Sequence, residues 1–177
     1  MLSTNPTFEL LYALFPDAQA QPAASVIPAE HLPEPYHRLL VHNHHMTVTV
    51  EDFHGGAVDV KVMACRRNGD EYARKILLAL SESGKIVQFG LVRIDLGVCP
   101  EPVRRAIGEG KTPLGRILIQ HDMLRRIEPT AFLKVKLNAA MADWFGTTAG
   151  THSYGRLGVI YTGDQPAVEV LEILAPV

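Results

Sequence analysis

The stretch Glu71-Tyr72-Ala73-Arg74-Lys75-Ile76-Leu77-Leu78-Ala79-Leu80 decides how the rest of the chain is interpreted. Successive side chains of a β-strand point to opposite faces, so Arg74 shares a face with Tyr72, Ile76, Leu78 and Leu80. Arg74 therefore falls on the more apolar face. A guanidinium keeps its proton at any ordinary pH and is costly to bury alone, so Arg74 needs an anion beside it, from the protein or from a ligand.

A second inward-pointing charge lies near the C-terminus, in residues 166–176. The more apolar face of this predicted strand is made by Val168, Val170 and Leu174. Glu172 lies among them. Two interpretations stay open: Arg74 and Glu172 form a buried ion pair that fixes the register of the sheet, or they flank a small, closed pocket that binds an anion.

The composition indicates an ordinary folded domain. The chain has 177 residues, enough for one domain with a core that needs neither disulfides nor metal. Hydrophobic residues make up 47%, charged residues 20%, and the formal net charge is −2, which does not indicate a nucleic-acid-binding or disordered protein. The start lacks the regions of a signal peptide, and no apolar run is long enough to span a membrane. We expect a cytoplasmic protein without a nucleic-acid partner, with Cys65 and Cys99 as free thiols; the sequence does not indicate an oligomeric state.

The first 31 residues are expected to form a separate N-terminal region. Residues 8–15 are a helix candidate that Pro16 ends. Prolines recur at intervals up to Pro35, which predicts an extended arm without regular structure after residue 16. The predicted division is an N-terminal helix and arm, residues 1–31, and a domain of residues 32–177.

The rest of the chain alternates between strand and turn patterns. The predicted strands are residues 57–65, 71–80, 85–96, 131–137, 154–161 and 167–174. The first three form a meander, and the last two a hairpin. Hairpins dominate and no βαβ alternation is present. The prediction is therefore an α+β fold, a single six-stranded antiparallel sheet with a few short helices packed on it.

Three histidines, His42, His44 and His45, lie within four residues and invite a metal hypothesis. Their spacing is poor for convergence on a helix, and no carboxylate or cysteine pattern completes a ligand set, so no metal is expected. Residues 47–50 favour a strand by propensity, although Asn43 equally suits the cap of a short helix. That local choice stays open.

Residues 110–116, Gly-Lys-Thr-Pro-Leu-Gly-Arg, predict the start of a helix. Thr112 suits the N-cap and Pro113 the first helical position. Free backbone N–H groups at a helix start suit a carboxylate, although an ordinary capped helix explains the same pattern. The spacing of the phosphate-binding P-loop is absent, so nucleotide binding is not expected.

Four motifs, taken in order, resemble those of the chorismate lyase family. They are His45-Met46-Thr47, residues 72–78, residues 110–116 and residues 171–176. The proline-rich arm and the histidine cluster are closer to the more distant branch of that family than to its best-known bacterial enzyme. The resemblance implies an antiparallel sheet with a small buried site. It also implies an enzyme that splits chorismate into 4-hydroxybenzoate and pyruvate without a cofactor, for quinone or phenolic lipid synthesis.

The resemblance further implies roles for four residues. Arg74 would bind the ring carboxylate, with backbone contacts at Met46 and Leu114. Glu172 would hold the 4-hydroxyl group. Arg74 and Glu172 are thus the candidate catalytic residues, with Met46 and Leu114 completing the substrate-binding set. Because loss of the enolpyruvyl ether with a ring proton makes the ring aromatic, the protein needs mainly to orient the substrate and assist proton movement.

One motif departs from the family pattern. Chorismate lyases can carry an arginine directly after the glycine of the third strand, whereas this chain has Gly90-Leu91. Arg93, two residues further on and on the same face as Leu91, is the candidate to replace it.

Two other functions remain open. By the resemblance, the same fold serves as the ligand-sensing half of bacterial transcription regulators, which would make the chain a binding module for a small aromatic acid. Those regulators carry an N-terminal winged helix-turn-helix, for which the residues before Leu32 are too few. A paralogue acting on a related enolpyruvyl or aromatic acid is the other alternative.

Overall fold

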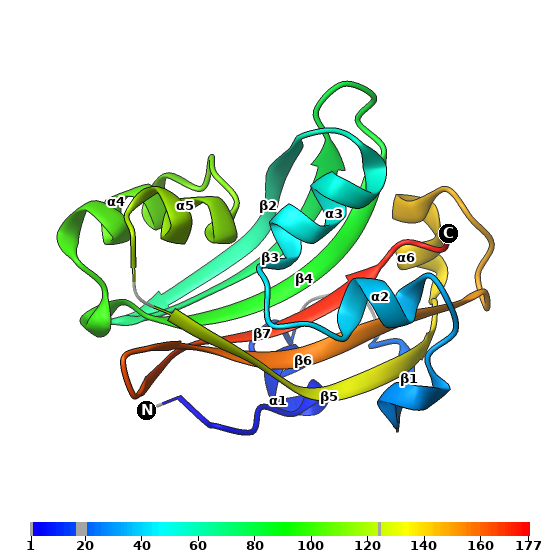
Figure 1. Cartoon of the computed structure of the whole chain (residues 1–177), viewed down its shortest axis with the longest axis horizontal. Coiled ribbons are helices and arrows are strands. Elements are labelled where there is room, and N and C mark those ends of the chain that lie inside the picture. Colours follow the sequence, from blue (N-terminus) through cyan, green and yellow to red (C-terminus); the bar gives the residue numbers. More distant parts are fainter. Residues whose placement is uncertain (1, 17–20, 124) are drawn as a thin grey trace.

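A twisted antiparallel sheet carries helices on both of its faces (Figure 1). The computed structural model describes residues 2–16, 21–123 and 125–177, apart from the side chain of Arg125. Within these residues the sheet has seven strands in the order β1-β5-β6-β7-β4-β3-β2. The strands are β1 (Ala23–Ile27), β2 (Val58–Asn68), β3 (Glu71–Leu80), β4 (Ile86–Asp95), β5 (Arg125–Lys136), β6 (His152–Thr162) and β7 (Gln165–Leu174).

The predicted α+β class with one antiparallel sheet is confirmed, including the meander β2-β3-β4 and the hairpin β6-β7. The predicted number of six strands is wrong. The seventh strand, β1, lies in the arm that was expected to lack regular structure, and it pairs with β5. Five residues without proline separate Pro22 from Pro28, which is enough for a short edge strand with a single partner. Residues 17–20 of the arm lie outside the described residues, and the division at residue 31 stays a prediction.

The α-helices among the described residues are short. They are α1 (Phe8–Tyr12), α2 (Tyr36–Leu40), α3 (Met46–His54), α4 (Glu101–Glu109), α5 (Leu114–Gln120) and α6 (Ala139–Phe145). Helices α1 and α6 pack on one face of the sheet, and α2, α3, α4 and α5 pack on the other (Figure 1). None of the helices in the described part of the chain has the length and apolar character needed to cross a membrane.

Two helix starts differ from the sequence patterns. Residues 47–50 are helical, and α3 begins directly after His45 rather than at a cap on Asn43. Helix α5 begins at Leu114, one residue later than predicted, because Pro113 has an extended backbone (ψ 140°) and takes the N-cap position expected for Thr112. Both helices therefore start at a residue that the resemblance assigns to the site, Met46 or Leu114.

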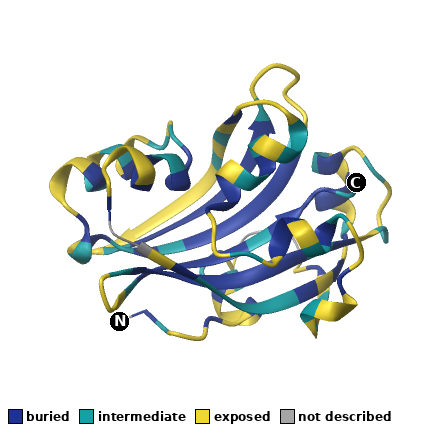
Figure 2. Cartoon of the chain, in the orientation of Figure 1, coloured by how far each residue is buried: buried dark blue, intermediate teal, exposed yellow. Residues whose placement is uncertain are grey.

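The core divides into three apolar clusters on the two faces of the sheet, whose middle strands are largely buried (Figure 2). One lies under α1 and α6. On the opposite face, one cluster lies under α4 and α5 and includes Tyr72 and Val170, and the other lies under α2 and α3 and includes Ile76 and Leu174. On the same face, Arg74 lies between Tyr72 and Ile76 of β3, and Glu172 lies between Val170 and Leu174 of β7. The two inward-pointing charges thus mark the boundary between two apolar clusters.

Candidate functional site

A small cavity occupies this boundary, between the sheet and the first turns of α3 and α5. Its volume is about 50 Å³. The four residues assigned from the resemblance, Met46, Arg74, Leu114 and Glu172, all line it. They come from two strands and two helix starts that are far apart in the sequence, so the fold brings the four together in one place.

Close contact between α3 and α5 closes the roof of the cavity. A Cβ atom added at Gly115 would lie 3.0 Å from the Cβ atom of His45 and 3.0 Å from Oγ1 of Thr47. Arg116 forms an ion pair with Glu51 of α3, and the same carboxylate accepts a hydrogen bond of 2.9 Å from the N–H group of Val58. Gly115 permits the approach, and the ion pair holds the two helices together over the cavity.

The role of Gly115 gives a stability prediction. Gly115→Ala is expected to lower the free energy of unfolding by about 1–3 kcal/mol, because the added methyl group overpacks the contact between α3 and α5. Gly108→Ala is the control, since a Cβ atom there meets nothing within 4 Å and alanine favours a helix. Urea unfolding measures both variants. Equal stability of the two would contradict a tight contact at Gly115.

Arg74 is the most unusual residue in the cavity. Its side chain is 1% exposed, and its Nε and Nη1 atoms have no hydrogen-bond partner in the described part of the chain. Burial lowers the pKa of Arg74, and the neighbouring Tyr72 hydroxyl opposes that shift. A guanidinium nevertheless stays protonated in proteins, so the cavity contains a positive charge and two nitrogen atoms, Nε and Nη1, whose N–H groups are unused within the described residues.

Of the two interpretations of Arg74 and Glu172, the direct ion pair is not observed among the described residues. Glu172 pairs instead with Arg156 of β6, whose Nε donates a hydrogen bond of 2.7 Å to Glu172 Oε2. Arg156 and Glu172 lie directly opposite each other on neighbouring strands, and the Arg156 side chain is only 2% exposed. The structural ion pair that the periodicity suggested therefore exists, but with a different arginine.

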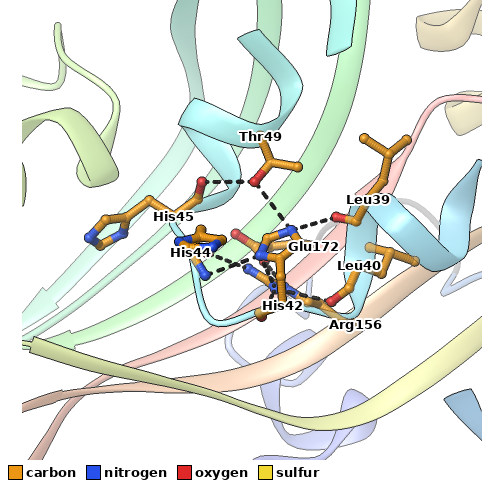
Figure 3. Close-up of polar contacts among 8 residues, drawn as sticks. All are labelled: Leu39, Leu40, His42, His44, His45, Thr49, Arg156 and Glu172. Atoms are coloured by element: carbon orange, nitrogen blue, oxygen red, sulfur yellow. Dashed lines mark hydrogen bonds and ion pairs between the residues drawn. The ribbon is translucent and has the colours of Figure 1, made fainter. Parts of the chain in front are cut away.

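Arg156 also holds the loop that leads into α3 (Figure 3). Its Nη1 donates to the carbonyl oxygens of Leu40 at 3.1 Å and His42 at 2.9 Å, and its Nη2 donates to that of His44 at 3.2 Å. One buried guanidinium thus fixes both Glu172 and the backbone immediately before Met46. Sequence reasoning did not select Arg156.

The ring of His42 makes hydrogen bonds within this part of the chain. The Nε2 atom of His42 lies 2.8 Å from the carbonyl oxygen of Leu39 and 3.2 Å from Oγ1 of Thr49. Burial, and then repulsion by Arg156, lower the pKa of His42, which favours the neutral ring. Within residues 2–16, 21–123 and 125–177, no three His, Cys, Asp or Glu side chains are arranged to hold a metal ion.

Arg93 does not replace the missing arginine. It lies on the opposite face of the sheet and forms ion pairs with Glu71 at 2.6 Å and with Glu169 at 3.3 Å. The expectation for Arg93 was wrong because its face, shared with Leu91, packs toward α1 and α6. The cation beside Glu172 comes from Arg156 on the adjacent strand.

Comparison with known proteins supports the fold. No family model and no curated protein matches the chain by sequence. Among solved structures, the effector domain of PhnF from Mycobacterium smegmatis is similar at a TM-score of 0.55 and 12% identity, over 77% of this chain and 91% of that domain. PhnF from the same organism is similar at a TM-score of 0.54 and 12% identity, over 77% of this chain and 65% of PhnF. The chain thus shares the α+β fold of these domains, and it spans about two thirds of the length of PhnF.

Proposed function

We propose that the chain is a binding domain for a small hydroxylated aromatic acid, held in the cavity by its carboxylate. The observation that carries this proposal is the buried Arg74 side chain, whose Nε and Nη1 lack partners within the described residues. An unpaired buried charge costs several kcal/mol, and a ligand carboxylate would offset that cost with charge-assisted hydrogen bonds. Of its neighbours on the same face of β3, Ile76 is apolar and Tyr72 offers only a neutral hydroxyl group, so neither supplies the anion that a buried guanidinium needs.

The rest of the cavity suits such an acid. Met46 and Leu114 begin α3 and α5, where the first N–H groups of a helix have no acceptor within the helix. Glu172 provides an acceptor for a ligand hydroxyl group, and Arg156 keeps its carboxylate in place. The walls also include the apolar side chains of Ile76, Leu78 and Val92, as a ring requires.

The size of the cavity favours binding that moves the helices above it. A volume of about 50 Å³ holds only a few water molecules at ~10–15 Å³ each. An aromatic acid needs α3 and α5 to separate from the sheet, so occupancy of the cavity would be coupled to the position of these helices. Such coupling is what a sensor needs, and the similarity to the effector domain of PhnF supports this function.

Chorismate lyase activity is the second candidate. It is favoured by one specific observation, that Arg74, Glu172, Met46 and Leu114 line the same cavity. Chorismate bound by its ring carboxylate to Arg74 would direct its hydroxyl group toward Glu172. Elimination of pyruvate would then require only correct orientation and movement of the ring proton.

One experiment separates the two candidates. Calorimetric titration is expected to show saturable binding of 4-hydroxybenzoate and weaker binding of benzoate, which cannot contact Glu172 through a hydroxyl group. Incubation with chorismate, with and without EDTA, tests turnover in the same preparation. Binding without turnover supports the sensor, whereas equal yields of 4-hydroxybenzoate and pyruvate that survive EDTA would establish the lyase. Failure of 4-hydroxybenzoate to bind would refute the proposed ligand class.

A further inference from the structure

Three more buried polar residues line the cavity, and besides His45 and Thr47 at the start of α3 they include Gln88 of β4. Gln88 is 3% exposed, and its Oε1 atom has no hydrogen-bond partner in the described part of the chain. Neither the sequence patterns nor the resemblance assigned Gln88 a role. Its position relative to Arg74 and Glu172 indicates one.

The strand register places Arg74, Glu172 and Gln88 in a row along the floor of the cavity. Arg74 lies opposite Val92, Glu172 lies opposite Gly90, and Gln88 is two residues further along β4. A strand advances about 3.3 Å per residue, so the backbone positions of Val92 and Gln88 are roughly 13 Å apart. The guanidinium is therefore at one end of the cavity floor, the carboxylate is in the middle, and the amide is at the other end.

The packing around Gln88 does not explain why this residue is polar. Its partners across the two neighbouring strands are Leu78 and Leu174, both apolar and buried. A buried amide oxygen without a donor destabilises the protein, and an apolar side chain would fit this position of the sheet without that penalty. The unused acceptor therefore resembles the unused donors of Arg74 at the opposite end, and both point to a ligand.

We propose that Gln88 is a specificity-determining residue that recognises a second hydroxyl group of the ligand, remote from its carboxylate. A hydroxyl group both donates and accepts, so it satisfies either orientation of the amide. Glu172, between the two ends, disfavours a second anionic group near Gln88. This proposal rests on the proposed function. It narrows the ligand class from hydroxybenzoates to aromatic acids with at least two hydroxyl groups, one of them beyond the 4-hydroxyl as seen from the carboxylate. A suitable probe is 4-hydroxy-3-(2-hydroxyethyl)benzoate, whose side chain can carry a hydroxyl group past the 4-position.

The test compares two ligands on two proteins. Calorimetry gives the ratio of the affinity for 4-hydroxy-3-(2-hydroxyethyl)benzoate to the affinity for 4-hydroxybenzoate. This ratio is expected to exceed one for the unmodified chain and to fall roughly tenfold in Gln88→Met, since one hydrogen bond of a buried amide is lost. Without ligand, the melting temperature of Gln88→Met is expected to rise, because an unsatisfied polar group has been removed. Gln165→Met, at an exposed position at the start of β7, is the matched control and should change neither quantity.

The possible outcomes are distinguishable. An unchanged affinity ratio in Gln88→Met, or a lower melting temperature without ligand, overturns the role of Gln88 while binding of 4-hydroxybenzoate still supports the proposed function. If neither acid binds the unmodified chain, both proposals fail. Gln88→Leu provides the same comparison if Gln88→Met does not fold.

Discussion

Arg74→Met is expected to weaken binding of 4-hydroxybenzoate by about 2–5 kcal/mol, the usual cost of deleting a buried charged hydrogen-bonding group. The melting temperature should stay at or above that of the unmodified chain. Methionine keeps the apolar stem of the side chain, and the guanidinium that it replaces has two N–H-bearing atoms without partners within the described residues. No carboxylate is left unpaired, because Glu172 remains bonded to Arg156. Calorimetry and thermal unfolding provide the two measurements.

Arg93→Met is the matched control for this prediction. Arg93 is also a strand arginine at the centre of the sheet, but it has two carboxylate partners, Glu71 and the buried Glu169, on the opposite face. Its replacement should lower the melting temperature and leave the affinity for 4-hydroxybenzoate intact. The two variants thus separate a ligand-binding arginine from a structural one. A badly destabilised Arg74→Met with normal affinity would show that Arg74 is the structural residue.

The alternation of side chains along β3 and β7 was sufficient to predict which face of the sheet carries Arg74 and Glu172. Residues 71–80 are predicted and observed as the same strand, and Arg74 and Glu172 both lie on the face assigned to them. Periodicity gives the face of a side chain but not its neighbour across the sheet, which depends on strand order and register. For that reason the sequence located the two charges on the correct face, but it could not decide between an ion pair and a pocket.

Arg156 shows why the true partner of Glu172 was not accessible from the sequence. Counting back from the turn that joins Thr162 to Gln165, a regular hairpin would place Arg156 opposite Leu171, on the other face of the sheet. An irregularity between Ile160 and Tyr161 shifts the register by one residue and brings Arg156 opposite Glu172. A shift of this kind leaves no clear mark in the pattern of hydrophobic residues. Strand β1 was missed for a related reason, since its pairing with β5 is set by tertiary structure rather than by its five residues alone.

Arg156→Met is expected to lower the free energy of unfolding by about 3–5 kcal/mol, the usual cost of removing one partner of a buried ion pair. Glu172 would be left as a carboxylate without its cation, and the carbonyl oxygens of Leu40, His42 and His44 would lose their shared donor. Urea unfolding measures the loss. Arg105→Met is the control, because the ion pair between Arg105 and Glu101 is exposed and should contribute less than about 1 kcal/mol.

The double variant Arg156→Met with Glu172→Gln separates the two parts of this loss. Removing the negative charge of Glu172 should restore the part of the lost stability that comes from the broken ion pair. The effects of the two substitutions on the free energy of unfolding should therefore not add. The part of the loss that comes from the three carbonyl oxygens should remain, because the substitution at position 172 does not restore the guanidinium that donates to them. Removal of the Arg156 guanidinium should therefore lower the stability of the ligand-free protein. Removal of the Arg74 guanidinium should instead lower the affinity for the ligand. If Arg156→Met is as stable as Arg105→Met, or if the effects of the double variant simply add, the buried pair does not hold the site together.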